Sequence, residues 1–144
     1  MDEKVIATFD ESLRRCDTHP KFLDIFYEKF LASSPKVREK FSNTDFARQK
    51  RLLRASFYMI LLASEDEQHG PERYLKFLAA HHASNALNIG AQLYDLWLDS
   101  LLQAVKQCDP RYTTEVEEAW EEVMGVGIRY MLEHYHPPHP VKLV

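Results

Sequence analysis

Apolar residues recur at intervals of three and four along most of this chain, a spacing that places them on one face of an α-helix. The pattern predicts helices over residues 3–16 and 21–33, a short helix that begins after Ser34 and ends near Phe41, and a long helix from Asn43–Asp45 to about Ser64. Farther along, it predicts a helix that carries Leu75, Leu78 and His82, a corner over residues 83–88, a helix to about Gln107 and a last helix from Thr114. No alternating strand pattern occurs, so the sequence predicts an all-α fold.

Residues beside the helix ends predict how the helices start and stop. Ser34 precedes Pro35, and a serine side chain can accept a hydrogen bond from the first turn while proline fits its first position. Thr114 is followed three residues later by Glu117, a spacing typical of a capping box at the start of the last helix. Prolines at positions 137, 138 and 140 cannot continue that helix, so residues 136–144 are expected to form a loose tail.

Composition narrows the class of protein. With 144 residues, of which 45% are hydrophobic and 28% charged, the chain fits one globular domain over residues 1–144. A formal net charge of -4 without a basic stripe argues against a nucleic-acid partner. The longest apolar run, residues 57–63, is far shorter than the ~20 residues that span a bilayer, so no membrane segment is expected. The acidic start at Asp2 and Glu3 is unlike a signal peptide, which favours a cytoplasmic location.

The position of His82 is the most informative single feature. It follows Leu78 by four residues on an apolar helix stripe, downstream of one helix face that carries Tyr27 and another that carries Gln49. In an all-helical chain, this order predicts a neutral imidazole that faces an apolar pocket, with two hydrogen-bond donors on the opposite wall. Such a pocket suits an iron porphyrin. His81 points about 100° away on the same helix and is the alternative ligand.

These residues together resemble the globin pattern. The likeness rests on Pro35 with Phe41 six residues later, Tyr27 eight residues before that proline, Gln49 and Leu53 four residues apart, and Leu78 and Ala79 ahead of His82. The set of Tyr27, Gln49 and Leu53 resembles bacterial single-domain globins and the globin portion of flavohaemoglobins. The stretch 93–99 is also similar to sensor-type bacterial globins. The resemblance covers residues 5–135. It implies a three-over-three helical sandwich with haem b between the helices that carry Gln49 and His82.

The resemblance also implies a role for each pocket residue. His82 would bind the iron, and the other expected haem contacts are Phe41, Leu53, Leu78, Leu87, Ile89 and Tyr94. Dioxygen gains negative charge when it binds ferrous haem, so a nearby hydrogen-bond donor stabilises it. Tyr27 and Gln49 would supply such donors across the haem from His82, and Leu53 would shape the ligand cavity there.

One departure from flavohaemoglobins limits the expected chemistry. In that family, a glutamate on the last helix and a tyrosine on the preceding helix hydrogen-bond near the ligand histidine. Counting from Trp120 places Tyr135, rather than Glu133, where that acid would fall, while Tyr94 is the candidate for the tyrosine. No flavin or nicotinamide reductase domain follows, so turnover by this chain alone is not expected.

The expected function is reversible binding of oxygen or another diatomic gas, such as nitric oxide or carbon monoxide. Conversion of nitric oxide to nitrate, an enzyme activity that the sequence leaves open, would need a separate reductase. The alternative is a gas or redox sensor that signals through a partner protein. A globin-fold interaction protein without haem is a third interpretation, against which His82 and the apolar pocket argue.

Overall fold

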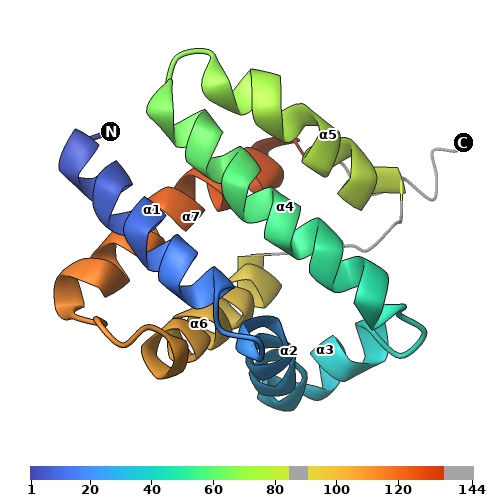
Figure 1. Ribbon diagram of the computed structural model, residues 1–144. Helices are drawn as coiled ribbons and strands as arrows, with labels where there is room; N and C mark the ends of the chain where they lie inside the picture. Colours follow the sequence, from blue (N-terminus) through green and yellow to red (C-terminus); the bar gives the residue numbers. More distant parts are fainter. Residues whose placement is uncertain (85–90, 135–144) are drawn as a thin grey trace, which may run out of the picture.

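The computed structural model describes residues 1–84 and 91–134, except for the side chains of residue 77 and residues 80–84. All regular structure within these ranges is helical, as the apolar spacing predicts (Figure 1). The helices are α1 (Glu3–Asp17), α2 (Phe22–Ser33), α3 (Pro35–Lys40), α4 (Phe46–Glu65), α5 (Gly70–Ser84), α6 (Ala91–Cys108) and α7 (Thr114–His134). Their bounds follow the predicted ones closely, because capping residues and prolines mark helix ends in the sequence.

The helices form two layers that cross each other (Figure 1). In one layer α4 packs against α1 and α5, and in the other α6 packs against α2 and α7. Helix α7 also joins the layers through contacts with α1, α4 and α5, while α3 lies beside α2. This is the three-over-three arrangement that the resemblance implies. Within the described ranges, no helix combines the length and the apolar character that crossing a membrane requires.

Side chains just before the first turn fix the starts of α3 and α4. Ser34 accepts a hydrogen bond from the backbone N–H of Lys36 at 3.1 Å, as its place before a proline predicts. Asp45 accepts one from the backbone N–H of Arg48 at 3.2 Å. Each bond satisfies a donor that the helix itself leaves free, so both starts are defined locally by the sequence.

The predicted capping box at Thr114 is wrong by one residue. The Thr113 hydroxyl, not that of Thr114, accepts a hydrogen bond from the backbone N–H of Val116 at 3.2 Å. The Glu117 carboxylate is hydrogen-bonded to the Tyr112 side chain instead of closing the box. Two threonines stand next to each other here, and the spacing alone does not distinguish which one caps α7.

Two glycines allow α4 to approach its neighbours closely. A Cβ atom at Gly70, the first residue of α5, would lie 2.4 Å from the carbonyl oxygen of Ala63 on α4. A Cβ atom at Gly127 on α7 would lie 2.7 Å from Cδ1 of Ile60. Both separations are shorter than non-bonded atoms can pack. The crossing at Gly70 depends on the absence of a side chain because it meets backbone, whereas at Gly127 the side chain of Ile60 would have to move.

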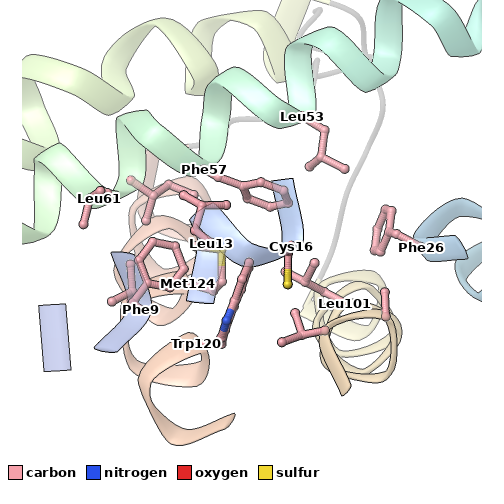
Figure 2. Close-up of a cluster of buried hydrophobic side chains, with 14 of the residues drawn as sticks. Phe9, Leu13, Cys16, Phe26, Leu53, Phe57, Leu61, Leu101, Trp120 and Met124 are labelled. Carbon is pink, nitrogen blue, oxygen red and sulfur yellow. The ribbon is translucent and has the colours of Figure 1, made fainter. Parts of the chain in front are cut away.

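Aromatic side chains fill the core where α1, α4 and α7 meet (Figure 2). Trp120 of α7 lies edge-on to Phe9 of α1, with ring centroids 4.7 Å apart, and to Phe57 of α4 at 5.7 Å. Edge-to-face pairs of this kind stabilise a core beyond the area that they bury. The apolar faces predicted for these three helices therefore share one core.

Helix α2 carries apolar residues on more than one face, and only part of them are buried. Its buried residues are Phe22, Phe26, Tyr27 and Phe30, whereas Leu23, Ile25 and Leu31 are half-buried. The helix packs mainly against α6 and α3, and its remaining apolar residues pack only partly against the core.

A buried carboxylate attaches the corner between α6 and α7 to α1. Asp109 accepts hydrogen bonds from Nε and Nη2 of Arg15 at 2.6 and 2.9 Å, from the Ser12 hydroxyl at 2.6 Å and from the backbone N–H of Arg111 at 2.8 Å. Ser12 accepts one from Nε1 of Trp120 at 2.8 Å. Burial by itself raises the pKa of Asp109, but the hydrogen bonds, that of Arg15 first, lower it below the ordinary value. The carboxylate therefore stays ionised in the folded protein.

Candidate functional site

A cavity of about 400 Å³ lies between the two helical layers. Helices α2, α4, α6 and α7 form most of its wall, with the end of α3 at one side and α5 contributing Leu78. Most of the wall is apolar, and the side chains of this kind are Phe30, Val37, Phe41, Leu52, Leu53, Ile60, Leu78, Leu93, Trp97, Met124, Ile128 and Met131. The volume suits a cofactor or small-molecule site, since such sites occupy about 300 to 1,000 Å³.

Residues predicted for the pocket from several helices lie together on this wall. They are Tyr27, Phe41, Gln49, Leu53, Leu78 and Tyr94. The backbone of His82 belongs to α5, but its side chain and that of His81 lie outside the described residues, as do Leu87 and Ile89. The structure thus brings the described candidates together, while their roles in holding haem and iron stay predictions.

Two polar side chains are paired with each other in the cavity wall. Tyr27 on α2 is 5% exposed, and its side chain is hydrogen-bonded to that of Gln49 on α4. Burial raises the pKa of Tyr27, and the bond to Gln49 opposes that rise as the smaller effect. The phenol therefore stays protonated at physiological pH and keeps a hydrogen that it can donate.

Aromatic rings fix the position of Tyr27. Its ring centroid lies 4.8 Å from that of Phe26, 5.3 Å from that of Phe46 and 6.3 Å from that of Phe41, and each pair meets edge to face. Phe26 in turn lies edge-on to Trp97 of α6. Because α2, α4, α6 and the end of α3 all contribute to this packing, the fold sets the place of the hydroxyl.

Polar and charged residues gather at one side of the cavity, where α3 leads into α4. They are Lys40, Asn43, Thr44, Asp45 and Arg48. Asn43, Asp45 and Arg48 are exposed, so this side faces solvent. The cavity therefore has an apolar interior and a polar opening, which fits an amphipathic ligand whose charged groups point toward water.

Part of the cavity wall was not assigned to the site from sequence. Trp97, Gly127 and Met131 lie on the cavity lining, on the apolar faces of α6 and α7. Helical spacing carried this signal, because a stripe that faces the core also faces any cavity within the core. Lys40 and Arg48 carried no such signal, since exposed charged residues occur throughout the chain.

The two residues compared with the acid and tyrosine pair of flavohaemoglobins have different surroundings. Tyr94 is buried on α6 and lines the cavity. Glu133 is exposed near the end of α7, and Tyr135 lies outside the described residues. Helix α7 makes a different acidic contact, in which the Tyr130 hydroxyl donates a hydrogen bond to Glu72 of α5 at 3.1 Å. That bond joins the first turn of α5 to α7.

The crossing of two helical layers around one cavity is the globin fold. No protein-family model matches the chain, and no curated protein matches it. Among solved structures, it is similar to the crystal structure of a Pseudomonas aeruginosa protein described as structurally highly homologous to a human hemoglobin, with 40% sequence identity and a TM-score of 0.82. The match covers 91% of this chain and 98% of that one. This chain therefore belongs to the globin family, with the bacterial single-domain globins.

Proposed function

We propose that this globin binds haem b in the cavity and reversibly binds a diatomic gas beside it. The observation that carries the proposal is the hydrogen-bonded pair of Tyr27 and Gln49 in a mostly apolar wall. Burying polar groups costs free energy, and an apolar pair would close the same wall without that cost. The presence of this polar pair is therefore better explained by a ligand that needs a hydrogen-bond donor. The hemoglobin-like description of the similar Pseudomonas aeruginosa structure supports the same function.

The residues around the cavity fit haem. A porphyrin is a broad apolar ring with two carboxylate groups, and the cavity combines an apolar interior with Lys40 and Arg48 at its opening. The ring of Phe41 lines the wall, where it would pack against the porphyrin. When bound, haem would supply a ferrous iron that can take up a diatomic gas.

We assign the iron ligand to His82, with Leu87, Ile89 and Tyr94 as further haem contacts. Helix α5 brings Leu78 to the cavity wall, and His82 follows it by four residues on the same helix. His82 follows Leu75 by seven residues and Leu78 by four, which keeps the three on one helix face, whereas His81 follows Leu75 by six and lies off that face. The carbonyl group of Leu78 would accept the second ring N–H and so orient the imidazole.

The opposite wall would hold the gas. Tyr27 donates a hydrogen bond to it, and Gln49 keeps the tyrosine hydroxyl in place. Leu53 and Phe41 are apolar parts of the same wall and restrict both space and water. A gas that gains negative charge on binding benefits from this donor more than one that does not.

Absorbance spectra test the haem and its ligand. The purified protein should show a Soret band, and His82→Ala should greatly weaken haem retention unless imidazole is added. His81→Ala is the matched control and should leave the ferrous spectrum nearly unchanged. The reverse pair of results would move the ligand to His81. A wild-type protein that takes up no haem would overturn the proposed function.

A second spectrum tests the gas side. Gln49 is a poor iron ligand, and α4 carries no histidine. The ferrous protein should therefore keep an open or water-accessible sixth position. A resting ferrous spectrum dominated by low-spin, six-coordinate iron would contradict this and point to another side chain as a ligand.

Among gases, we propose oxygen as the main ligand, with conversion of nitric oxide to nitrate where a separate reductase supplies electrons. Nitric oxide consumption by the haem-loaded protein, measured with and without an added reductase, tests the second activity. A sensor would instead copurify with a signalling partner and release or bind it when the gas is removed. Gas binding without turnover and without a partner would leave oxygen binding as the function.

A further inference from the structure

A second hollow, of about 230 Å³, lies on the surface between α2 and α4. It is lined by Asp24, Tyr27, Glu28, Leu31, Phe46 and Lys50. Tyr27 also lines the large cavity, whereas Phe46 lines the hollow and stands outside the cavity wall. The rings of Tyr27 and Phe46 therefore separate the hollow from the cavity.

Phe46 is the more movable member of this ring pair. Tyr27 is buried and packs edge-on against Phe26 and Phe41. Phe46 is half-buried in the first turn of α4 and contacts Tyr27 at 5.3 Å and Phe41 at 6.3 Å, both through ring packing. A rotamer change of one half-buried side chain moves far fewer atoms than a displacement of helices does, so Phe46 is the ring that can open.

The polar opening of the large cavity offers a poorer path once haem is in place. Lys40 and Arg48 stand at that opening, and the carboxylate groups of haem would lie beside them. A gas that enters there must pass the edge of the porphyrin to reach Tyr27. On the side of the hollow, the ring contact between Phe46 and Tyr27 lies between the gas and the cavity wall that Tyr27 forms.

We propose that diatomic gases reach the Tyr27 side of the cavity from the hollow between α2 and α4, and that Phe46 controls their passage. The inference rests on the proposed haem function. Lys50 and Asp24 form an ion pair that joins α4 to α2 at the rim of the hollow. This pair holds the two helices together next to the passage, while Phe46 closes it.

Carbon monoxide rebinding after flash photolysis tests the passage in the haem-loaded protein. Phe46→Ala should raise the association rate by about threefold or more, which corresponds to about 0.7 kcal/mol, and Phe46→Trp should lower it by a similar factor. A passage residue changes entering and leaving alike. The dissociation rate should therefore change by the same factor, and the equilibrium affinity should stay constant.

Controls separate passage from packing. Leu62→Trp, at an exposed position on the same helix, should leave both rates unchanged. An altered oxygen dissociation rate at a constant carbon monoxide association rate would mean that Phe46 only positions Tyr27. Unchanged rates in both Phe46 variants would mean that gases use the polar opening. Either result would overturn the inference.

Xenon supplies a measurement that does not depend on haem chemistry. As a small apolar probe it enters apolar cavities, and it should shift the methyl resonances of Leu31 and the ring resonances of Phe46 in NMR spectra. Phe46→Trp should reduce the shift at Leu31, because the larger ring would occupy part of the hollow. No shift in the wild-type protein would overturn the inference. A protein that shows the xenon shifts but retains no haem would instead count against the proposed function.

Discussion

The molecule buries polar side chains in two places, and the two are built in opposite ways. At the corner between α6 and α7, Asp109 accepts hydrogen bonds from Arg15, Ser12 and the backbone of Arg111 within packed protein. In the cavity wall, Tyr27 is hydrogen-bonded to Gln49 beside a space of about 400 Å³. The corner uses its polar groups to hold three helices together. The cavity wall places polar groups next to a space that a ligand can occupy.

The difference lies in what surrounds the polar atoms. At the corner, the Asp109 carboxylate, the Ser12 hydroxyl and Nε1 of Trp120 each have a protein partner, so removing one leaves another buried without its partner. The pair at the cavity stands where solvent or a ligand can replace a lost partner. A buried polar group therefore indicates function mainly when it borders a cavity. Burial of a polar group alone indicates only that the group has a hydrogen-bond partner within the protein.

Removal of the Asp109 carboxylate should produce the largest effect. Asp109→Ala leaves Arg15 and Ser12 without their acceptor, so the free energy of unfolding should fall by about 3 kcal/mol. Urea denaturation measures this. Asp10→Ala is the control, because its bond to Arg14 at 3.1 Å is exposed to solvent and should contribute less than about 1 kcal/mol.

The haem spectrum of the folded Asp109→Ala protein should match that of the wild type, because Asp109 does not line the cavity. If the variant lost little stability, the corner would not be the structural network that its hydrogen bonds describe. If it kept its stability but changed the gas-binding spectrum, the contrast between the two regions would fail.

Two glycine substitutions compare how well the α4–α5 crossing and the α4–α7 crossing accommodate an added methyl group. Gly70→Ala would press a methyl group against the Ala63 carbonyl oxygen, which belongs to the backbone, and should cost about 1 to 3 kcal/mol. Gly127→Ala meets only the tip of Ile60 at the cavity, so that side chain can turn aside and the cost should be smaller. Urea denaturation of both variants measures which one loses more free energy of unfolding.

A double substitution identifies the cause of the Gly127 effect. Ile60→Val removes the Cδ1 atom that the new methyl group would meet. In that background Gly127→Ala should cost less than in the wild type, or stabilise the helix by up to about 1 kcal/mol. An equal cost in both backgrounds would show that the α4–α7 crossing is not limited by this contact.

Tyr27→Phe should separate function from stability at the cavity. It keeps the ring and removes only the donor, and a lost hydrogen bond of about 1.4 kcal/mol corresponds to a tenfold change. Oxygen dissociation, measured by stopped flow, should speed up by about tenfold, whereas carbon monoxide dissociation should change much less. Stability should fall by less than in Asp109→Ala, because Gln49 is only half-buried and can turn to water.

Equal changes for the two gases, or none for oxygen, would show that Tyr27 serves packing alone. A stability loss as large as that of Asp109→Ala would show that the cavity wall and the corner are built alike. Either outcome would break the distinction between the two regions.

The fold was largely predictable because its signals are local. Ser34 and Asp45 start their helices through bonds to backbone groups two or three residues away, and such bonds follow from neighbouring residues. The stripe of Leu53 and Phe57 is buried as its helical spacing predicts. The capping box at Thr114 was wrong because two adjacent threonines offer the same local chemistry.

The site was predictable only where it coincides with apolar stripes or with the family resemblance. Tyr27 and Gln49 belong to the resemblance, and the structure shows that they meet. The contacts of Asp109 had no such signal, since its partners Arg15 and Ser12 are more than ninety residues away in the chain. Contacts of that kind depend on how helices cross, which no local spacing reports.

The pH dependence of stability gives the finest test of the corner. Because the pKa of Asp109 is lowered below its ordinary 3.8 in the folded protein, the unfolded chain binds a proton more readily. The ionised Asp109 carboxylate makes its full contribution to the free energy of unfolding well above pH 3.8. This contribution is lost as the pH falls through the folded pKa, with a slope of at most about 1.4 kcal/mol per pH unit. Asp109→Asn cannot titrate, so the gap in unfolding free energy between wild type and variant should narrow in acid. A gap that stays constant from pH 6 to pH 3 would mean that the ionised carboxylate is not what stabilises the corner.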